Sequence, residues 1–573
     1  MTIPSTTRIR PRQRPNIVFV FSDEHRWCSQ PFTEMPQLVA PNMVQLAQEG
    51  LRLDNCCSTA PICVPYRGML ITGMWPHQSS CVSNDFFSNG NIIGQDAPTI
   101  AHTFAQAGYA TSYIGKWHLK EETAINAGFD LFQHWLYGDD HWDTLVREEG
   151  TGTDWQSSKG YNAIGMTDQA LDFIARHADG ERPFMMMLSL NPPHWRWDDA
   201  PEEFLQLYPQ ETLPFRDNVT DPKYKEGLHR LHLQHYHAHV TAVDVQLGRI
   251  MTTLRERGIA DNTILIYTSD HGTSFGSNNV HSKGNPFDES VRVPFTIRWP
   301  GHVPANRVAD ANIGTMDLYP TLCGLAGIVP PAHCGGIDFS PIMLGRPGPD
   351  PATQFLAINN FQRNFYIQHV DPTGGATNTF APFRAVRSKR HTFVANAHGD
   401  WLLFDNQADP YQMRNLVDDP AYTTIKNNLR RELESWLAKA EDPFIPASWR
   451  GLSLAERIAT QNQHWSMVPF YPEWEVFCAT TLAPWLEKSS PDQASKLRAA
   501  SEQIFDEAFF GRYKALTVET QAVHEMGHFA AGGRGVRLSQ RPMADIRTEL
   551  QHHTTQAIAR FELQARLILG QSN

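Results

Sequence analysis

The sequence predicts an α/β protein whose mostly parallel sheet is sandwiched by helices. Apolar runs at residues 16–21, 183–190 and 263–268 have the length and composition of buried parallel strands. Amphipathic helical patterns separate these runs, and each run is followed closely by polar or charged residues. The carboxyl ends of parallel strands meet at one rim of a sheet, where open α/β folds place their sites. We therefore expect one site, built from several strand ends.

Composition limits the class of protein. The chain has 573 residues, 41% hydrophobic and 19% charged, which predicts a globular protein of two or more domains. Its net charge of −12 argues against nucleic acid as the main partner. Eight irregularly spaced cysteines are not a disulfide framework, and no long apolar segment predicts a membrane span. The basic, proline-rich start has no apolar core of a signal peptide, so we expect a cytoplasmic protein.

The first strand and its neighbours supply the first candidates. The run at 16–21 leads into Asp23 and Glu24, two carboxylates at a strand end. A helix is predicted at 41–49, where a proline begins the pattern and a glycine follows it. Asn84 lies in a later loop, as a candidate substrate contact.

The next strands carry basic candidates. A helix at 99–107 and a strand at 110–114 precede Gly115-Lys116-Trp117-His118. The buried run at 183–190 ends in an Asn-Pro-Pro segment and His194. The strand at 263–268 is followed by Asp270 and His271, and Lys283 comes a few residues later. Cationic groups gathered around a metal would form a cage for a tetrahedral anion.

The helix predicted at 228–257 is the longest in the first half of the chain. Its apolar residues recur at spacings of three and four, and they are Tyr236, Val240, Val243, Leu247, Ile250 and Leu254. Five histidines crowd its start, at 229, 232, 235, 237 and 239. A metal cluster is conceivable there, but we favour a solvated or partly packed helix face.

One stretch resembles the signature of the type I sulfatases. It reads Cys63-Val64-Pro65-Tyr66-Arg67, with Leu70, Thr72 and Gly73 behind it. The Gly-Lys-Trp-His segment at 115–118 also matches that family, and the resemblance covers roughly residues 14–445. It implies an alkaline phosphatase-like fold and a sulfuric ester hydrolase of the arylsulfatase and phosphonate monoester hydrolase branch. It also implies that a formylglycine-generating enzyme oxidises Cys63 to formylglycine, whose hydrate is the nucleophile.

The resemblance implies one divalent ion, and the donor types suit Ca²⁺ or Mn²⁺. Its implied ligands are Asp23, Glu24, Cys63, Asp270 and His271. Glu24 stands where most sulfatases have a second aspartate, and Tyr66 stands where many have serine.

The implied roles of the other residues are equally specific. Arg67 would steady the aldehyde hydrate and the ligand carboxylates. Lys116 would bind the sulfate, and His118 would take the proton in the release step. His194 or Lys283 would hold the transferring group and assist departure of the alcohol.

Three alternatives stay open. The closest is a phosphonate monoester or phosphodiester hydrolase on the same scaffold, which Glu24 favours, whereas Lys116 and His118 favour sulfate. A zinc metalloprotease is suggested by His524-Glu525-Met526-Gly527-His528, a pattern that arises by chance in a histidine-rich chain. The third is a non-catalytic binding protein with unmodified Cys63.

The sequence predicts a division of the chain into four parts. We expect a lead-in at 1–14, a catalytic domain at 15–375, a small α+β subdomain at 376–445 and a helical extension at 446–573. Strand patterns at 382–394 and 401–405 and a helix at about 421–440 define the subdomain, as a small antiparallel sheet. A long amphipathic helix is marked by Met543, Ile546, Leu550, Ala557, Ile558, Phe561, Ala565 and Ile568. Such an extension often docks on another subunit, so we expect a homo-oligomer, a dimer or tetramer.

Overall fold

The computed structural model describes residues 14–79, 81, 84, 98–119, 126–135, 140–148, 155–280, 282–358, 383–396, 399–442, 444, 481–505 and 543–570. The chain divides into two compact units. The first comprises the described residues within Met1–Asn360, Arg384–Val394 and Leu402–Trp436. The second comprises those within Phe361–Phe383, Ala395–Trp401 and Leu437–Asn573.

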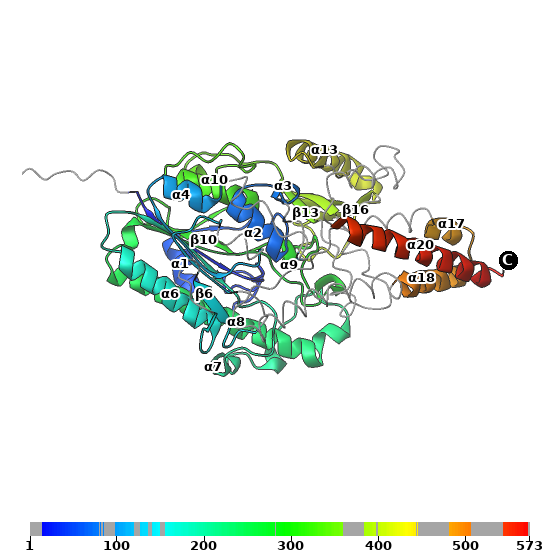
Figure 1. Cartoon of the computed structure of the whole chain (residues 1–573), viewed down its shortest axis with the longest axis horizontal. Coiled ribbons are helices and arrows are strands. Elements are labelled where there is room, and N and C mark those ends of the chain that lie inside the picture. The colour runs from blue at the N-terminus through cyan, green and yellow to red at the C-terminus, as the bar shows by residue number, and fades with distance from the viewer. Residues whose placement is uncertain are drawn as a thin grey trace, which may run out of the picture. The chain divides into compact units, whose positions relative to one another are not determined.

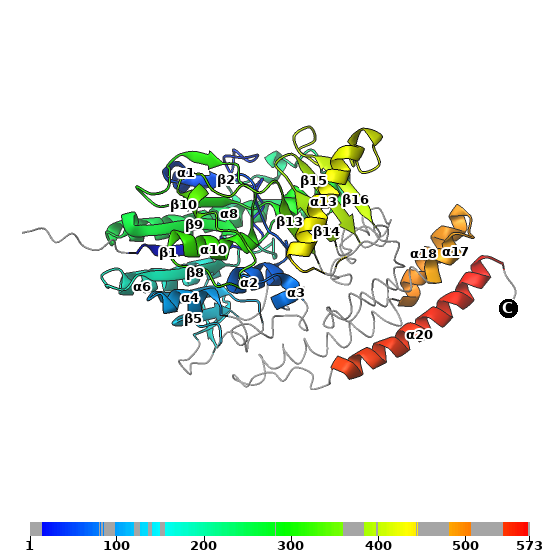
Figure 2. The same cartoon turned by 90° about the horizontal axis from the view of Figure 1, so that it is seen from above.

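A large mixed sheet forms the centre of the first unit. Its ten described strands lie in the order β11-β2-β10-β9-β1-β8-β4-β5-β6-β7. In chain order they are β1 (Asn16–Ser22), β2 (Leu51–Leu53), β4 (Ala110–Lys116), β5 (Leu131–Trp135), β6 (Leu145–Glu148), β7 (Gln156–Ser157), β8 (Phe184–Leu190), β9 (Thr263–Ser269), β10 (Phe295–Arg298) and β11 (Arg307–Ala309). The five central strands, β9-β1-β8-β4-β5, run parallel, and β10 is antiparallel to its neighbours. Figure 2 shows β10, β9, β1 and β8 side by side. The predicted α/β class is confirmed.

The register of the central strands brings their polar ends together. Ser22 at the end of β1 pairs with Leu190 of β8 and with Ser269 of β9. The backbone N–H of Asp23 donates to the carbonyl of Leu190 at 3.0 Å, and that of Asp270 donates to the carbonyl of Ser22 at 3.1 Å. The strand ends therefore converge on one rim, as the sequence predicted.

Helices cover both faces of this sheet (Figure 1). On one face lie α2 (Cys63–Thr72), α4 (Ile100–Gln106) and α10 (Thr315–Leu325), and on the other α1 (Pro41–Glu49), α6 (Asn162–His177) and α8 (Gly227–Glu256). In β1, Ile17, Phe19 and Phe21 pack into the first of these cores, and Val18 and Val20 into the second. Because both faces are buried, the strand is apolar at nearly every position.

Short elements connect this framework. They are β3 (Cys56–Cys57), α3 (Pro76–Ser79), α7 (Glu202–Leu205), η1 (Gln210–Thr212), η2 (Pro222–Lys225), η3 (Ala260–Asn262), η4 (Ser277–Asn279), α9 (Asp288–Val291), β12 (Ile313–Gly314) and α11 (Ser340–Met343). Strands β3 and β12 form a small parallel sheet of their own.

A separate small antiparallel sheet follows the large one in the chain. Its order is β13 (Gln354–Ile358), β14 (Phe383–Arg387), β15 (His391–Asn396) and β16 (Asp400–Asp405). Turns at Ser388 and Gly399 join the last three strands into hairpins. The short helix η5 (Pro420–Tyr422) leads into α13 (Thr423–Lys439), where a helix was predicted.

The second unit contains a helix pair. Helices α18 (Pro491–Phe505) and α20 (Met543–Ile568) lie side by side in both views, and α17 (Ala483–Leu486) precedes them (Figures 1 and 2). Ala557, Phe561 and Ala565 of α20 are buried, as are Leu497 and Ile504 of α18. The predicted amphipathic helix of the tail is therefore present. None of the described helices is both long and apolar enough to cross a membrane.

Candidate active site

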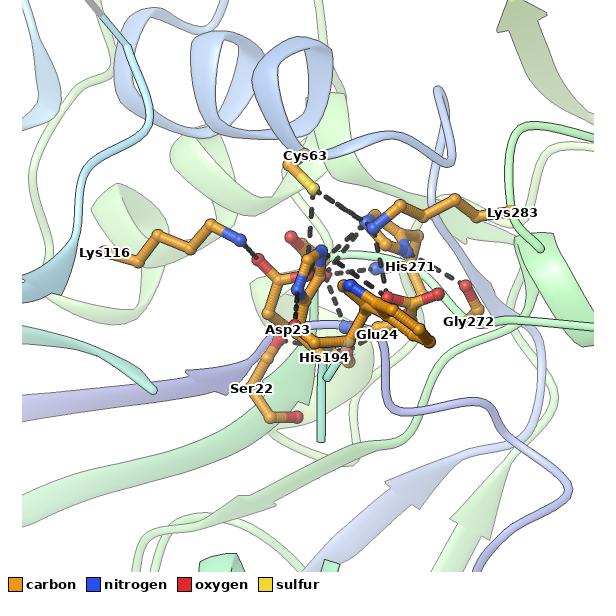
Figure 3. Close-up of polar contacts among 12 residues, drawn as sticks. Ser22, Asp23, Glu24, Cys63, Lys116, His194, His271, Gly272 and Lys283 are labelled. Atoms are coloured by element: carbon orange, nitrogen blue, oxygen red, sulfur yellow. Dashed lines mark hydrogen bonds and ion pairs between the residues drawn. The ribbon is translucent and has the colours of Figure 1, made fainter. Parts of the chain in front are cut away.

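Cys63 occupies the first position of α2, where the chain passes from an extended Ile62 into the helix. Its side chain is fully buried. Figure 3 shows the sulfur pointing at the cluster of carboxylates, histidines and lysines on the sheet rim. A helix N-terminus carries partial positive charge, so this position favours a negatively charged or electron-rich group.

The sulfur of Cys63 lies close to several predicted site residues. Its Sγ lies 3.2 Å from His271 Nε2, 3.6 Å from Lys283 Nζ and 3.7 Å from Asp23 Oδ1. Burial would raise the pKa of this thiol, but the charges of Lys283, Lys116 and His271 outweigh it and lower the pKa well below its ordinary value. The surroundings therefore stabilise negative charge at residue 63.

Arg67 lies one turn further along α2 and joins the two aspartates. Its guanidinium donates to Asp23 Oδ2 at 2.9 Å and to Asp270 Oδ2 at 3.4 Å, and all three side chains are buried. It also donates to the carbonyl of Lys116 at 2.6 Å and to Ser189 Oγ at 2.7 Å. One planar fork thus connects α2 to the ends of β1, β9, β4 and β8.

The two aspartates differ in their electrostatic surroundings. Burial opposes ionisation of Asp23, but the positive charges of Lys116, His194 and Lys283 hold its pKa well below the ordinary range. Burial and the negative charge of Asp23 raise the pKa of Asp270 to about 7. Two buried carboxylates at one point resist simultaneous ionisation, and a bound cation would relieve that repulsion.

Lys116 reaches the same point from the end of β4. Its Nζ lies 2.7 Å from Asp23 Oδ2. The preceding Gly115 has φ +111°, and a Cβ there would overlap the carbonyl oxygen of Ser189. Only glycine allows this close approach of β4 to β8, which explains why glycine precedes the lysine in the motif.

His118 follows at a positive φ of 55° and is hydrogen-bonded to Cys63. Burial is the main cause that lowers the pKa of its imidazole. A half-buried histidine whose neutral form is favoured, beside residue 63, is suited to accept a proton there.

Glu24 takes part in the same cluster. Its Oε2 lies 3.1 Å from Lys283 Nζ and 3.6 Å from His194 Nε2. Its backbone adopts φ 73°, a conformation that residues other than glycine rarely adopt. Strained backbones of this kind cluster at functional sites. Figure 3 shows Lys116 and Lys283 approaching the carboxylates from opposite sides.

Asn84 lies beside α2 rather than among these charges. Its Oδ1 accepts a hydrogen bond from the backbone N–H of Val64 at 3.0 Å. This contact satisfies one of the free amides of the first helical turn. The predicted substrate contact at Asn84 stays a prediction.

The residues present fit a divalent cation. Asp23, Cys63, Asp270 and His271 each offer one donor atom within 4.8 Å of the others, and all four are buried. Asp23 and Glu24 form a second such group with His194. The carboxylate of Asp270 is the main cause that raises the pKa of His271 to about 9, against the effect of burial. Buried carboxylates that converge with an imidazole form a donor set that suits a divalent ion.

Two supporting residues escaped the sequence analysis. Ser189 is the one hydroxyl in an otherwise apolar β8, and it accepts from Arg67. The hydroxyl of Tyr113, in β4, lies 3.2 Å from the same guanidinium. A polar residue inside a buried strand was the available signal, because such a group needs a partner.

The remaining predicted motifs fall elsewhere. The His-Glu-x-x-His segment at 524–528 lies outside the described residues. Of the five histidines on α8, those at 232, 235, 237 and 239 are buried. The ligand atoms of His239, His141 and Asp199 lie within 4.8 Å of one another, so His239 groups with residues outside α8.

Two family models match the chain. The model described as sulfatase matches residues 15–328, more than half of the 573 residues. The model described as N-sulphoglucosamine sulphohydrolase, C-terminal, matches residues 276–439.

Individual proteins are similar over most of their length. An ulvan-active sulfatase of Formosa agariphila is 31% identical over 442 residues, which cover 75% of this chain and 82% of the relative. An N-acetylglucosamine-6-O-sulfatase of Bacteroides thetaiotaomicron is 26% identical and covers 75% and 87%. Among solved structures, the phosphonate monoester hydrolase of Agrobacterium radiobacter has a TM-score of 0.61 at 20% identity, covering 74% and 96%, and this likeness concerns the fold.

Proposed function

The chain belongs to the sulfatase family and is a sulfuric ester hydrolase, and from this premise we propose that residue 63 carries its chemistry. A formylglycine-generating enzyme would first oxidise Cys63 to formylglycine. The observation that carries the proposal is the position of Cys63 Sγ, within 3.7 Å of His271, Lys283 and Asp23. As the hydrated aldehyde, residue 63 would supply a hydroxyl nucleophile.

A divalent ion completes the proposed site. Its ligands are Asp23, Glu24, Asp270 and His271, together with residue 63. Carboxylate oxygens with one imidazole suit Ca²⁺ or Mn²⁺. When bound, the ion would polarise the sulfate group and lower the pKa of the attacking hydroxyl.

The side chains around residue 63 have separable tasks. Lys116 and Lys283 bracket the position of the transferring group with two positive charges (Figure 3). Preorganised cations in a buried site stabilise charge on equatorial oxygens far better than water does. We propose that His194, whose Nε2 lies 3.6 Å from Glu24 Oε2, protonates the departing alcohol oxygen. His118 would accept the hydroxyl proton when inorganic sulfate leaves.

A sulfated sugar is the proposed substrate class. A relative that shares 26% identity over 511 residues is named for N-acetylglucosamine-6-O-sulfate chemistry. Trp195, which follows His194, is partly buried and packs edge-on against Trp197, 5.4 Å between ring centroids. An aromatic face beside the group that protonates the alcohol could pack against a sugar ring.

The rival reactions have less support. The relatives named above are sulfatases, and the phosphonate monoester hydrolase shares the fold only. Sulfate and phosphonate esters are similar in size, so a slow side reaction is compatible with the site. The alternative of a non-catalytic binding protein is excluded because the chain is a sulfuric ester hydrolase. The His-Glu-x-x-His pattern behind the metalloprotease alternative lies outside the described residues.

The experiment combines mass spectrometry with kinetics. The protein is produced with a formylglycine-generating enzyme, and the peptide containing residue 63 is analysed for conversion of thiol to aldehyde. The converted enzyme is then assayed with nitrophenyl sulfate and nitrophenyl phenylphosphonate, with Cys63→Ala as control. We expect aldehyde, a higher kcat/KM for the sulfate and no activity in the control. Activity that persists in Cys63→Ala, or with unconverted thiol, would refute the proposed nucleophile.

We also propose that the protein acts in the cytoplasm as a homo-oligomer. The oligomer proposal rests on the helix pair of the second unit, whose α20 exposes Leu563 and Leu567.

A further inference from the structure

A second group of metal-ligating side chains lies apart from residue 63. It consists of His141, Asp199 and His239, which we call the HDH cluster. His141 precedes α6, Asp199 lies in the loop after β8, and His239 lies on α8. One ligand atom of each lies within 4.8 Å of the others. Both imidazoles are fully buried, and the carboxylate is 18% exposed.

Two ring nitrogens converge on one carboxylate oxygen. His141 Nδ1 lies 2.8 Å from Asp199 Oδ1, and His239 Nε2 lies 3.3 Å from the same oxygen. The ring centroids are 4.3 Å apart, with the planes inclined by 43°. Two imidazoles and one carboxylate form a donor set that suits transition metals, zinc above all, better than it suits Ca²⁺.

The spacing of the donor atoms is close to that of a tetrahedral zinc site. Zinc–ligand bonds place neighbouring ligand atoms about 3.3 Å apart. The pair His239–Asp199 already has this separation, at 3.3 Å. The pair His141–Asp199, at 2.8 Å, is hydrogen-bonded and would have to open slightly. The partly exposed carboxylate leaves a path for an ion to enter.

Surrounding groups hold the ligands in place. His239 Nδ1 lies 2.7 Å from the hydroxyl of Tyr161, so its other nitrogen, Nε2, is directed at Asp199. The backbone N–H of His141 donates to Asp199 Oδ2 at 3.0 Å. The carbonyl of Arg196 lies 3.2 Å from His239 Nε2 and could supply a fourth donor. Partners of this kind fix the tautomer and orientation of metal-binding histidines.

The protonation states suit a metal site. Burial is the main cause that lowers the pKa of His239 to about 4, so the ring is neutral at pH 7. Burial opposes ionisation of Asp199, but hydrogen bonds from His141 and His239 hold its pKa well below the ordinary range. Metal ligands must present lone pairs, and the neutral ring of His239 and the carboxylate of Asp199 can do so.

We propose that the HDH cluster binds one zinc-type transition-metal ion, separate from the catalytic ion. The ion would replace the ring protons that now lie between each imidazole and the carboxylate. The ring nitrogen that faces the ion must be unprotonated, and on His239 a proton moved to Nδ1 would then donate to the hydroxyl oxygen of Tyr161.

Such an ion would be structural, because it would anchor the loop that begins at His194. Asp199 is five residues after His194, and its carbonyl accepts from Trp142 Nε1 at 2.6 Å. The N–H of Ala200 donates to His235 Nδ1 at 3.2 Å. The loop is therefore already tied to α8 and to the segment before α6, and a metal would join all three.

Metal analysis of the full-length enzyme tests the proposal. The protein is stripped with chelator, reloaded with Zn²⁺ and either Ca²⁺ or Mn²⁺, and analysed by mass spectrometry of the elements. We expect one zinc and one catalytic ion per chain. Asp199→Asn and His239→Gln should lose the zinc and keep the catalytic ion, whereas Asp270→Asn should keep the zinc and lose the other. Co²⁺ loaded in place of zinc should give a tetrahedral absorption spectrum that Asp199→Asn abolishes.

Two controls separate this site from other zinc ligands. His235→Gln alters a neighbouring buried histidine outside the cluster, and His528→Gln removes the His-Glu-x-x-His pattern of the tail. Both should keep the zinc. Circular dichroism and the retained catalytic ion show that the cluster variants fold. The proposal is overturned if folded wild type holds no zinc beyond the catalytic site, or if Asp199→Asn retains it, and the cluster is then a hydrogen-bond network alone.

Discussion

Lys116 Nζ lies 2.7 Å from Asp23 Oδ2, in an ion pair whose carboxylate is fully buried. In the proposed mechanism this lysine would therefore contact both the metal ligand Asp23 and the transferring group. We expect Lys116→Met to lower kcat/KM for nitrophenyl sulfate by about 10²- to 10³-fold, as loss of one charge-stabilising donor does elsewhere. Lys116→Arg, which keeps the charge, should recover part of it. The assay requires that conversion of residue 63 is verified in each variant, and an unchanged kcat/KM in Lys116→Met would contradict the role.

The second prediction concerns the contribution of Arg67 to stability, because its guanidinium joins four strand ends. Arg67→Met would leave Asp23 and Asp270 without their shared guanidinium, and breaking a buried ion pair typically lowers stability by about 3–5 kcal/mol. Arg67→Lys should lose less, since it keeps the charge but not the fork. Urea unfolding measures both. A matched control is Arg414→Met, which breaks an exposed pair with Asp419, 3.1 Å long, and should change stability little. Equal losses in Arg67→Met and Arg414→Met would contradict this view of Arg67.

The parts of the site that could be predicted share one property. Asp23, Lys116, His194 and Asp270 each lie at or just after the end of a strand that the sequence marks clearly, and parallel strands end at a common rim. The strands at the edge of the sheet were harder to predict from the sequence. Strands β6 and β7 are exposed or half-buried, so they carry no apolar run. Helix α10 contains Pro320 in its interior, which argues against a helix when only the sequence is known.

Contacts across the chain were harder to foresee than motifs. Asp199 lies 58 residues from His141 and 40 from His239, and nothing local links the three. The histidines of α8 suggested a helix face or a cluster within the helix, because positions three or four apart share a face. The actual partners of His239 come from two loops. A pattern within one helix cannot indicate which loops reach it.

Glu24 offers a test of the metal ligands. Its Oε2 lies 3.1 Å from Lys283 Nζ, so the carboxylate could serve the ion and the lysine together. We expect Glu24→Gln to raise the Kd of the stripped enzyme for Ca²⁺ or Mn²⁺ about tenfold or more, since one anionic donor is lost. Glu24→Asp keeps the charge and tolerates positive φ better, so its Kd should rise less. Titration calorimetry makes the comparison, and wild-type affinity in Glu24→Gln would remove Glu24 from the ligand set.

The helix pair of the second unit leads to a test of oligomeric state. Phe561 and Ala565 of α20 are buried, yet Leu563 and Leu567 are 52% and 67% exposed. Burial of such leucines against a second copy would be favourable by about 1.5–3 kcal/mol each. We expect light scattering to give a dimer or tetramer for wild type and a smaller mass for Leu563→Glu combined with Leu567→Glu. Arg560→Glu, on the same helix, controls for added negative charge. A monomeric wild type would refute the predicted oligomer.

The burial of His237 leads to a prediction of how the free energy of unfolding depends on pH. It is fully buried on α8, and neither ring nitrogen has a hydrogen-bond partner within the described part of the chain. Burial lowers the pKa of its imidazole well below the ordinary value. As the pH falls below about 6.5, the unfolded chain therefore binds a proton that the folded chain does not, and the free energy of unfolding decreases by up to about 1.4 kcal/mol per pH unit. This contribution to stability is complete above pH 6.5 and is lost on acidification.

Replacement of His237 isolates this effect from the other buried histidines. His237→Leu removes the titrating group and the unpaired nitrogens. In urea unfolding between pH 7 and pH 5, the free energy of unfolding should therefore fall less steeply with decreasing pH, by the equivalent of about one bound proton. The exposed His302→Leu controls for loss of a histidine as such. At pH 7 the leucine variant should be at least as stable as wild type, because a buried polar group without a partner is destabilising. A slope identical to that of wild type would show that His237 takes up its proton in the folded state. The prediction that its buried imidazole stays neutral would then be wrong.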